Sequence, residues 1–301
     1  MATCTRQRQC FRFRRFYFIT IFILLLTGCK STEVGIFYQP LNRDLSVSDQ
    51  EWQRFSAQLP TENITRVITQ WSRYGDEQFG GNTGWLAERF EVLLGNDLTL
   101  WFGLYSDPNY FKAIHSDINQ QARYLDQYFL TMKQEYQNWK PWLNQHDKHI
   151  EGVYFPLELS DYDFSTKQQR SQVNRMLAQQ LKFYQHPVMI SLYMSGTITP
   201  DEMAEWTQQL SDIGLIVFVQ DGAGTGSLED ETRLDYLNSL DCNIGRIEEI
   251  FKQNPDDTDF SASRLTKQEY QQVRSDTSCH LSSLFSLRYL PVLNNPLKLG
   301  D

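Results

Sequence analysis

The chain has 301 residues, with 28 lysines and arginines against 37 aspartates and glutamates, and its formal net charge is −9. Five of the arginines lie in residues 1–28, which contain no acidic residue. The rest of the chain therefore has 23 basic and 37 acidic residues, a formal charge of −14. A body of this charge repels nucleic acid and anionic lipid headgroups, so the composition excludes both as partners.

The first element of the chain is a leader typical of bacterial lipoproteins. An apolar run, 16–26, follows a basic region and ends in Leu26-Thr27-Gly28-Cys29. The basic region contains Arg6, Arg8, Arg12, Arg14 and Arg15. About 12 apolar residues are too few to span a bilayer, which needs about 20, and they suit a cleaved signal peptide.

We therefore expect a signal peptide over 1–28 and one domain over 29–301, with lipid attached to Cys29. An uncleaved signal anchor is the alternative. The next residue is Lys30 and not Asp, which predicts a lipid-anchored protein of the bacterial cell envelope, at the outer membrane and facing the periplasm. In that oxidising compartment the remaining cysteines, Cys242 and Cys279, are a candidate disulfide.

Beyond the leader, short β-branched or aromatic runs alternate with amphipathic helical stretches. The runs are 34–39, 65–71, 98–105, 150–158, 188–193, 214–220, 244–251 and 283–290. Seven helical stretches lie between them, the first beginning at a capping box formed by Ser48 and Glu51. One long helix is predicted over 110–144, and Asp163 or Ser165 is predicted to cap the next.

Eight strands with seven intervening helices predict an α/β protein with a (β/α)8 TIM barrel. Such barrels typically take about 250 residues, which fits this chain. The apolar run 214–219 is what a parallel strand buried on both faces requires. A doubly wound open sheet is the alternative, but Tyr38-Gln39-Pro40-Leu41 is not a Gly-rich phosphate loop.

Barrel enzymes carry their chemistry at the carboxyl ends of the strands. Here these ends carry amides, carboxylates and aromatic rings, which hydrogen-bond sugar hydroxyls and stack on the apolar faces of sugars. The candidate substrate-binding residues are Gln39, Gln70, Trp71, Tyr105, Asp161, Tyr193, Gln220 and Asp221. Three of them, Trp71, Tyr105 and Tyr193, are predicted to form a stacking platform, whereas Asp221 could equally stabilise a turn.

Four strand-end motifs resemble those of a bacterial domain-of-unknown-function family whose members are envelope proteins with a glycosidase-like TIM barrel. The motifs are GIFYQP at 35–40, TQWSRY at 69–74, YFPLELSD at 154–161 and QDGAG at 220–224. The resemblance covers nearly the whole chain after the leader. It implies the fold and an association with carbohydrate.

By analogy with retaining TIM-barrel glycosidases, the acid/base follows strand four and the nucleophile follows strand seven. Glu158 and Glu249 occupy these places, and Glu248 competes for the second. Retention requires the two carboxyl groups to be about 5–5.5 Å apart, with one pKa raised. The related enzymes usually have Asn before the acid/base, whereas this chain has Leu157.

The sequence thus predicts a lipid-anchored envelope protein that acts on a polysaccharide, as a retaining glycoside hydrolase. The alternatives are a non-catalytic glycan-binding lipoprotein accessory to polysaccharide export or assembly, and a purely structural envelope protein. Glu158 could also merely bond a loop backbone at the barrel mouth. No spacing of His or Cys resembles a zinc site, so no metal and no cofactor is expected.

Overall fold

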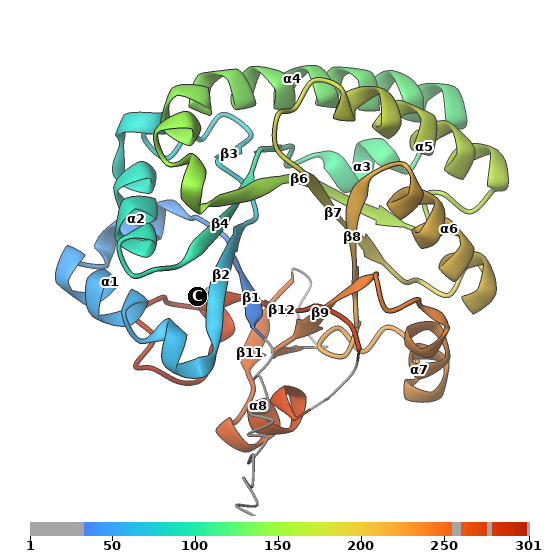
Figure 1. Ribbon diagram of the computed structural model, residues 1–301. Helices are drawn as coiled ribbons and strands as arrows, with labels where there is room; N and C mark the ends of the chain where they lie inside the picture. Colours follow the sequence, from blue (N-terminus) through green and yellow to red (C-terminus); the bar gives the residue numbers. More distant parts are fainter. Residues whose placement is uncertain (1–32, 255–259, 276–278, 300–301) are drawn as a thin grey trace, which may run out of the picture. The chain divides into compact units, whose positions relative to one another are not determined.

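The structure, a computed structural model, describes residues 33–254, 260–275 and 279–299 (Figure 1). In this part of the chain eight parallel strands close into a barrel in the order β1, β2, β4, β6, β7, β8, β9 and β12. They are β1 (Val34–Tyr38), β2 (Ile64–Thr69), β4 (Thr99–Gly103), β6 (Ile150–Ser160), β7 (Val188–Tyr193), β8 (Leu215–Gln220), β9 (Gly245–Glu249) and β12 (Ser282–Phe285). The predicted TIM barrel is confirmed, whereas the leader and Cys29 lie outside the described residues.

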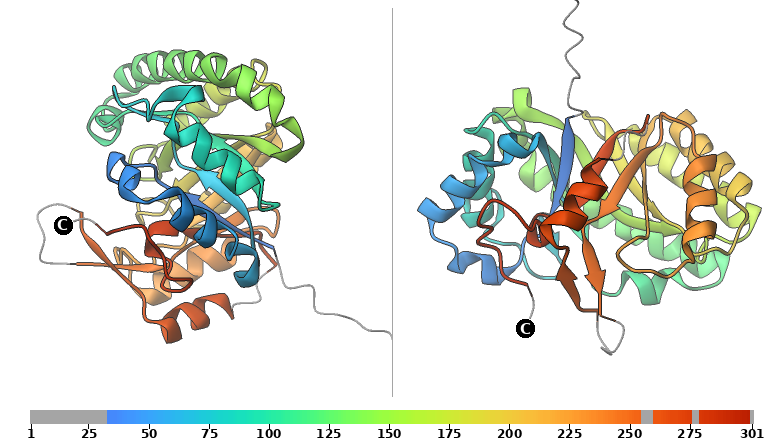
Figure 2. Two further views of the ribbon diagram at one scale, coloured as in Figure 1. Left: turned by 90° about the vertical axis from the view of Figure 1, so that its left-hand side faces the viewer. Right: turned by 90° about the horizontal axis from the view of Figure 1, so that it is seen from below.

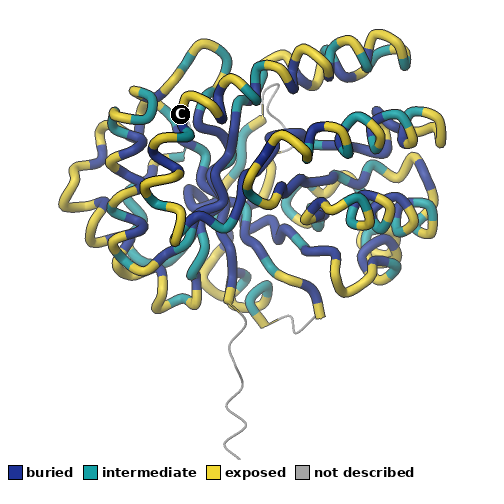
Figure 3. Tube along the Cα trace, turned by 45° about the horizontal axis from the view of Figure 1, so that its top comes forward, coloured by how far each residue is buried: buried dark blue, intermediate teal, exposed yellow. Residues whose placement is uncertain are grey.

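Helices lie between successive strands and cover the outside of the barrel (Figure 2). They are α1 (Asp49–Ser56), α2 (Trp85–Leu94), α3 (Tyr110–Ile114), α4 (Ile118–Gln145), α5 (Lys167–Leu181), α6 (Pro200–Asp212), α7 (Asp230–Ser239) and α8 (Lys267–Arg274). The strands are largely buried, and exposed positions follow the outer faces of the helices (Figure 3). Over 33–254, 260–275 and 279–299, we find no helix whose length and apolar character would let it cross a membrane.

One apolar side chain from each strand contributes to a cluster inside the barrel. These side chains are Phe37, Ile68, Trp101, Tyr154, Met189, Phe218, Ile247 and Phe285, of which only Phe285 is partly exposed. Successive residues of a strand point to opposite faces, so their neighbours in sequence point outward. This layer fixes which strand residues face the inside of the barrel.

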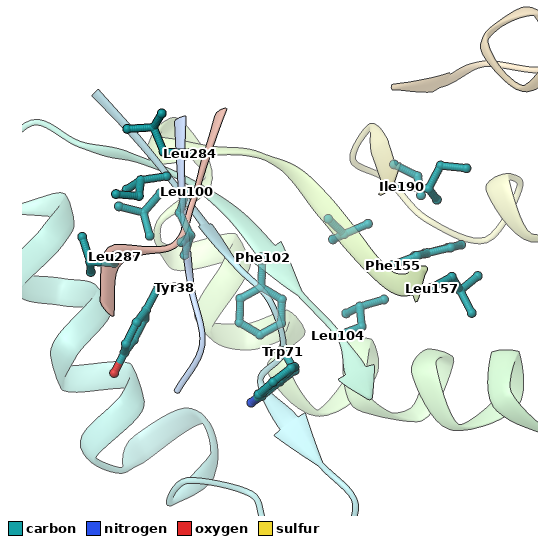
Figure 4. Packing of buried hydrophobic residues seen from close by; sticks show 14 of the residues in the cluster. Tyr38, Trp71, Leu100, Phe102, Leu104, Phe155, Leu157, Ile190, Leu284 and Leu287 are labelled. Carbon is teal, nitrogen blue, oxygen red and sulfur yellow. The ribbon is translucent and has the colours of Figure 1, made fainter. Parts of the chain in front are cut away.

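The outward-facing side chains pack against the helices in a second, larger apolar cluster. Tyr38, Phe102, Phe155 and Leu157 belong to it (Figure 4). Leu157 is fully buried among these apolar side chains. Leu157, the residue before Glu158, is therefore a core residue of this barrel.

Several predicted boundaries were wrong. The stretch 110–144 forms two helices, because Asp117 caps α4 by accepting hydrogen bonds from the N–H groups of Asn119 and Gln120. Thr166, and not Asp163 or Ser165, caps α5.

The last two predicted strands also end earlier than expected. β12 ends at Phe285 and is followed by a 3-10 helix, η5 (Leu287–Tyr289), so Arg288 and Tyr289 do not lie on a strand. Beyond β9, a short antiparallel pair formed by β10 (Phe251–Gln253) and β11 (Ala262–Arg264) was not predicted. Strand patterns of three residues are too short to stand out from the surrounding sequence.

Cys242 and Cys279 form a disulfide with Cα atoms 5.3 Å apart. They precede β9 and β12, which are neighbours in the barrel. The disulfide therefore joins the amino-terminal ends of the two strands, at the opposite end of the barrel from the carboxyl ends.

Candidate functional site

A cleft with a volume of about 1230 Å³ lies at the carboxyl ends of the strands. The alternation within the strands determines which residues form the floor of the cleft. A residue two positions after a residue of the interior layer faces the same way as that residue. Gln39, Gln70, Gln220 and Glu249 stand in this position after Phe37, Ile68, Phe218 and Ile247, and all four line the cleft. The volume slightly exceeds the 300–1,000 Å³ typical of small-molecule sites.

Glu158 enters the cleft through an irregularity of β6. Tyr154 pairs with Met189 of β7, but Glu158 pairs with Ser191, so β6 advances four residues while β7 advances two. Pro156 lies in this bulge, where a residue without an N–H is tolerated.

Two tyrosines of the surrounding helices support the bulge. The Tyr128 hydroxyl donates to the carbonyl oxygen of Pro156 at 2.9 Å, and the Tyr110 hydroxyl donates to that of Glu158 at 3.1 Å. Both tyrosines are buried. These bonds satisfy carbonyls in the irregular part of β6 and hold the backbone that carries Glu158.

Glu249 is seated by the loop that follows β8. Its Oε2 accepts hydrogen bonds from the N–H groups of Gly224 at 2.8 Å and Thr225 at 2.9 Å. A Cβ at Gly224 would lie only 2.7 Å from the carbonyl oxygen of Phe251, so glycine is required for this approach. Among the described residues, Oε1 of Glu249 has no hydrogen-bond partner.

Both carboxyl groups have raised pKa values. Burial, and secondarily the charge of Asp221, raises the pKa of Glu249 to about 7, although the two backbone N–H groups act in the opposite direction; the charge of Glu158 adds a smaller increase. Burial also raises the pKa of Glu158, against the effect of a hydrogen bond from Gln220. Each of the two carboxyl groups therefore holds its proton more tightly than an exposed carboxyl group would, mainly because of burial.

The competing acid, Glu248, faces the outside of the barrel. Ile247 belongs to the interior layer, so the next residue of β9 points outward and Glu249 points inward again. Glu248 lies close enough to Tyr270 of α8 for its charge to act on that phenol. Glu249 is thus the strand-seven acid in the cleft.

The predicted aromatic platform is only partly present. Tyr193 is partly exposed and lines the cleft, and Trp71 also lines it but is 8% exposed. The Trp71 ring lies 4.8 Å from that of Tyr74, which is itself exposed and also lines the cleft.

Tyr105 was wrongly assigned to the platform and lies outside the lining of the cleft. It belongs to β5 (Tyr105–Ser106), which pairs with β3 (Arg73–Tyr74) beyond the barrel. Its ring packs against Tyr128 and beneath the Arg73 guanidinium. The assignment failed because the chain leaves β4 at Gly103, after which the alternation of the strand no longer applies.

Two predicted acidic ligands have structural roles instead. Asp161 is fully buried and accepts hydrogen bonds from the backbone N–H groups of Ser195, Thr197 and Ile198, so it holds the loop after β7. Asp221 accepts from the N–H groups of Ala223 and Glu249 at 3.1 Å each. It stabilises the turn, as the alternative interpretation held, and fixes the backbone of Glu249.

Several cleft residues were missed by sequence reasoning. They come from α3, from loops and from the segment beyond β9, and include Arg43, Asp107, Phe111, Asn254 and Phe260. Arg288 and Tyr289, which were expected near the end of the eighth strand, also line the cleft. Arg288 is buried and pairs with Asp44 at 2.8 Å. The five missed positions have no strand periodicity, so the sequence carries no signal that would have assigned them to the cleft.

Solved structures share this fold at low sequence identity. A proposed alpha-L-fucosidase from Bacteroides thetaiotaomicron superimposes with a TM-score of 0.63 at 13% identity, covering 97% of this chain and 95% of that one. The catalytic domain of beta-amylase from Paenibacillus polymyxa has a TM-score of 0.50 at 8% identity, covering 90% and 95%. At these identities the likeness is one of fold alone, and the fold is glycosidase-like.

Relatives in sequence extend over the whole barrel. An uncharacterized protein of Escherichia coli K12, YbcH, is 28% identical over 299 residues, which cover 95% of this chain and 99% of the relative. The profile of a domain family of unknown function, DUF4434, matches residues 34–296, from the first strand to beyond the last. The chain therefore belongs to the DUF4434 family.

Proposed function

We propose that this protein is a lipid-anchored envelope glycoside hydrolase that cleaves a polysaccharide with retention of configuration. The observation that carries the proposal is that two carboxyl groups with raised pKa values, those of Glu158 and Glu249, line one cleft at the carboxyl end of the barrel. Amides and aromatic rings surround the pair, and such groups bind sugar hydroxyls and sugar faces.

In the proposed reaction, Glu249 is the nucleophile and Glu158 is the acid/base. The backbone N–H groups on Oε2 of Glu249 favour its charged form and leave Oε1 to attack the anomeric carbon. Protonated Glu158 transfers its proton to the departing glycosidic oxygen. Glu158, now ionised, then deprotonates the water that hydrolyses the glycosyl–Glu249 ester. Burial raises the pKa of Glu158, which favours the protonated form that an acid/base needs at the start of the reaction.

The envelope location rests on the leader and on Cys29, whose lipid would hold the acidic barrel at the outer membrane, facing the periplasm. Its partner there is a polysaccharide, and contact with the membrane runs through the lipid.

Amide variants of the two glutamates test the reaction. Glu158→Gln and Glu249→Gln should each lower turnover of a cleaved polysaccharide by about 10²–10⁴, or 3–5 kcal/mol of transition-state stabilisation. Glu248→Gln is the matched control, because Glu248 neighbours Glu249 but faces outward. NMR of the first product should give the anomer of the substrate. Wild-type turnover by both cleft variants would refute the mechanism.

A glycan-binding protein without hydrolytic activity is the second candidate. Buried Leu157 favours it, because related hydrolases use Asn at this place to bind the sugar 2-hydroxyl, and a leucine that packs outward cannot. In that case the wild-type protein binds a polysaccharide without releasing products, and Glu158→Gln changes neither result.

A further inference from the structure

Two large aromatic rings line the cleft yet remain open to solvent. Phe111 of α3 is 62% exposed, and Phe260, which precedes β11, is 59% exposed. Each has only one edge-on aromatic neighbour among the described residues, Tyr110 for Phe111 and Phe251 for Phe260. Neither ring has a part in the proposed cleavage step. Single exposed apolar residues are common on proteins, so the significance of these two rings depends on their positions.

The two rings lie on opposite sides of the barrel mouth. Phe111 is in the segment that follows β4, and Phe260 is in the segment that follows β9. In the closed ring of eight strands, β4 and β9 are separated by four steps in either direction. Accordingly, α3 and β11 lie on opposite sides of the strands in Figure 1. A ligand that touches both rings must cross the mouth.

Polar groups suited to hydroxyls line the cleft that such a ligand would cross. Glu158 and Glu249 are there, together with Gln39 and Gln70. Oε1 of Gln70 and Oε1 of Glu249 are buried acceptors without a hydrogen-bond partner in the described part of the chain. Buried acceptors of this kind call for donors, and sugar hydroxyls supply them.

We propose that the cleft binds an extended, uncharged polysaccharide across the mouth, with one sugar stacked on Phe111, another on Phe260, and the carboxyl pair between them. An uncharged chain fits because the formal charge of −14 repels a polyanion. This inference rests on the proposed function, and it makes the enzyme one that cleaves within a chain and releases oligosaccharides.

Calorimetry with oligosaccharides of defined length tests the inference. The full chain carrying Glu158→Gln, purified in detergent, is titrated with cellohexaose, maltohexaose and chitohexaose and with the corresponding disaccharides. At least one hexasaccharide should bind ten or more times tighter than its disaccharide. Adding Phe111→Ala or Phe260→Ala should weaken hexasaccharide binding about tenfold, because partial burial of a phenyl ring is lost. Disaccharide binding should change little.

Tyr162→Ala is the matched control, because Tyr162 is 56% exposed but lies outside the lining of the cleft. Three results overturn the inference: no hexasaccharide binds at millimolar concentration, hexasaccharide and disaccharide bind equally, or neither phenylalanine variant weakens binding. If the wild-type protein cleaves a polysaccharide but binding does not depend on the two rings, this inference is refuted and the proposed hydrolase activity stands. If binding depends on the two rings but no polysaccharide is cleaved, the proposed hydrolase activity is refuted and binding across the mouth stands.

Discussion

At the scale of single residues, the raised pKa of Glu249 makes the stability of the protein depend on pH. Its pKa is raised from 4.5 to about 7, first by burial, so the folded state holds this proton more tightly than the unfolded chain. Stability therefore falls as the pH rises from about 4.5 to 7, and the loss is complete above 7. The difference between a pKa of 4.5 and one of about 7 corresponds to a loss of about 3 kcal/mol of stability.

Glu249→Gln should accordingly stabilise the protein by up to about 3 kcal/mol at pH 8 and leave its stability unchanged at pH 4. The amide is uncharged at both values and can still accept from Gly224 and Thr225. Urea unfolding at the two pH values measures the difference. Glu91→Gln, on the exposed face of α2, is the control. A gain of the same size at both pH values would contradict the assignment.

At the scale of elements, the bulge of β6 places Glu158, and it depends on hydroxyl groups from α3 and α4. Tyr110→Phe and Tyr128→Phe each leave a carbonyl of β6 without its donor, which should cost about 1–3 kcal/mol of stability. Turnover should also fall, because Glu158 loses its fixed position. Tyr124→Phe is the control, because that hydroxyl donates to Asp107 and not to β6.

Urea unfolding and hydrogen exchange of the β6 amides measure both parts of this prediction. Exchange in β6 should be faster in Tyr110→Phe and Tyr128→Phe than in Tyr124→Phe. Equal exchange in all three proteins would mean that the bulge is held by the strands alone.

The disulfide between Cys242 and Cys279 joins two segments that precede neighbouring strands, with a sequence separation of 37. In the chain-entropy description, closing a loop of this length stabilises the folded state by about 4 kcal/mol. The double variant Cys242→Ser/Cys279→Ser should lose up to that amount in urea unfolding. Hexasaccharide affinity should stay unchanged, because the bond lies at the end of the barrel opposite the cleft. Weakened binding would contradict that separation.

At the scale of the whole molecule, the predicted lipid determines where the cleft can work. A barrel with a formal charge of −14 does not associate with an anionic membrane by itself. Metabolic labelling with a palmitate analogue should mark the wild-type protein and leave Cys29→Ala unlabelled. The variant should also move from the membrane to the soluble fraction of the envelope. Equal labelling of the two proteins would rule out attachment at Cys29.

By itself, the sequence determined the barrel and the strands that carry the two glutamates. Apolar runs of strand length and capped helices are both local patterns that can be recognised in a sequence. Few folds are consistent with eight such strands separated by helices. The position of Gln39, Gln70 and Gln220 at strand ends followed from the same periodicity.

Only the tertiary structure decided which side chains meet in the cleft. Periodicity stops where a strand ends, so Tyr105 and Asp161 turned away while Tyr74 turned in. The bulge of β6 arises from its pairing with β7 and from the tyrosines of α3 and α4 that support it. No local sequence pattern predicts these contacts. Phe111 and Phe260 line the same cleft because the barrel closes, and closure brings together residues that are far apart in the chain.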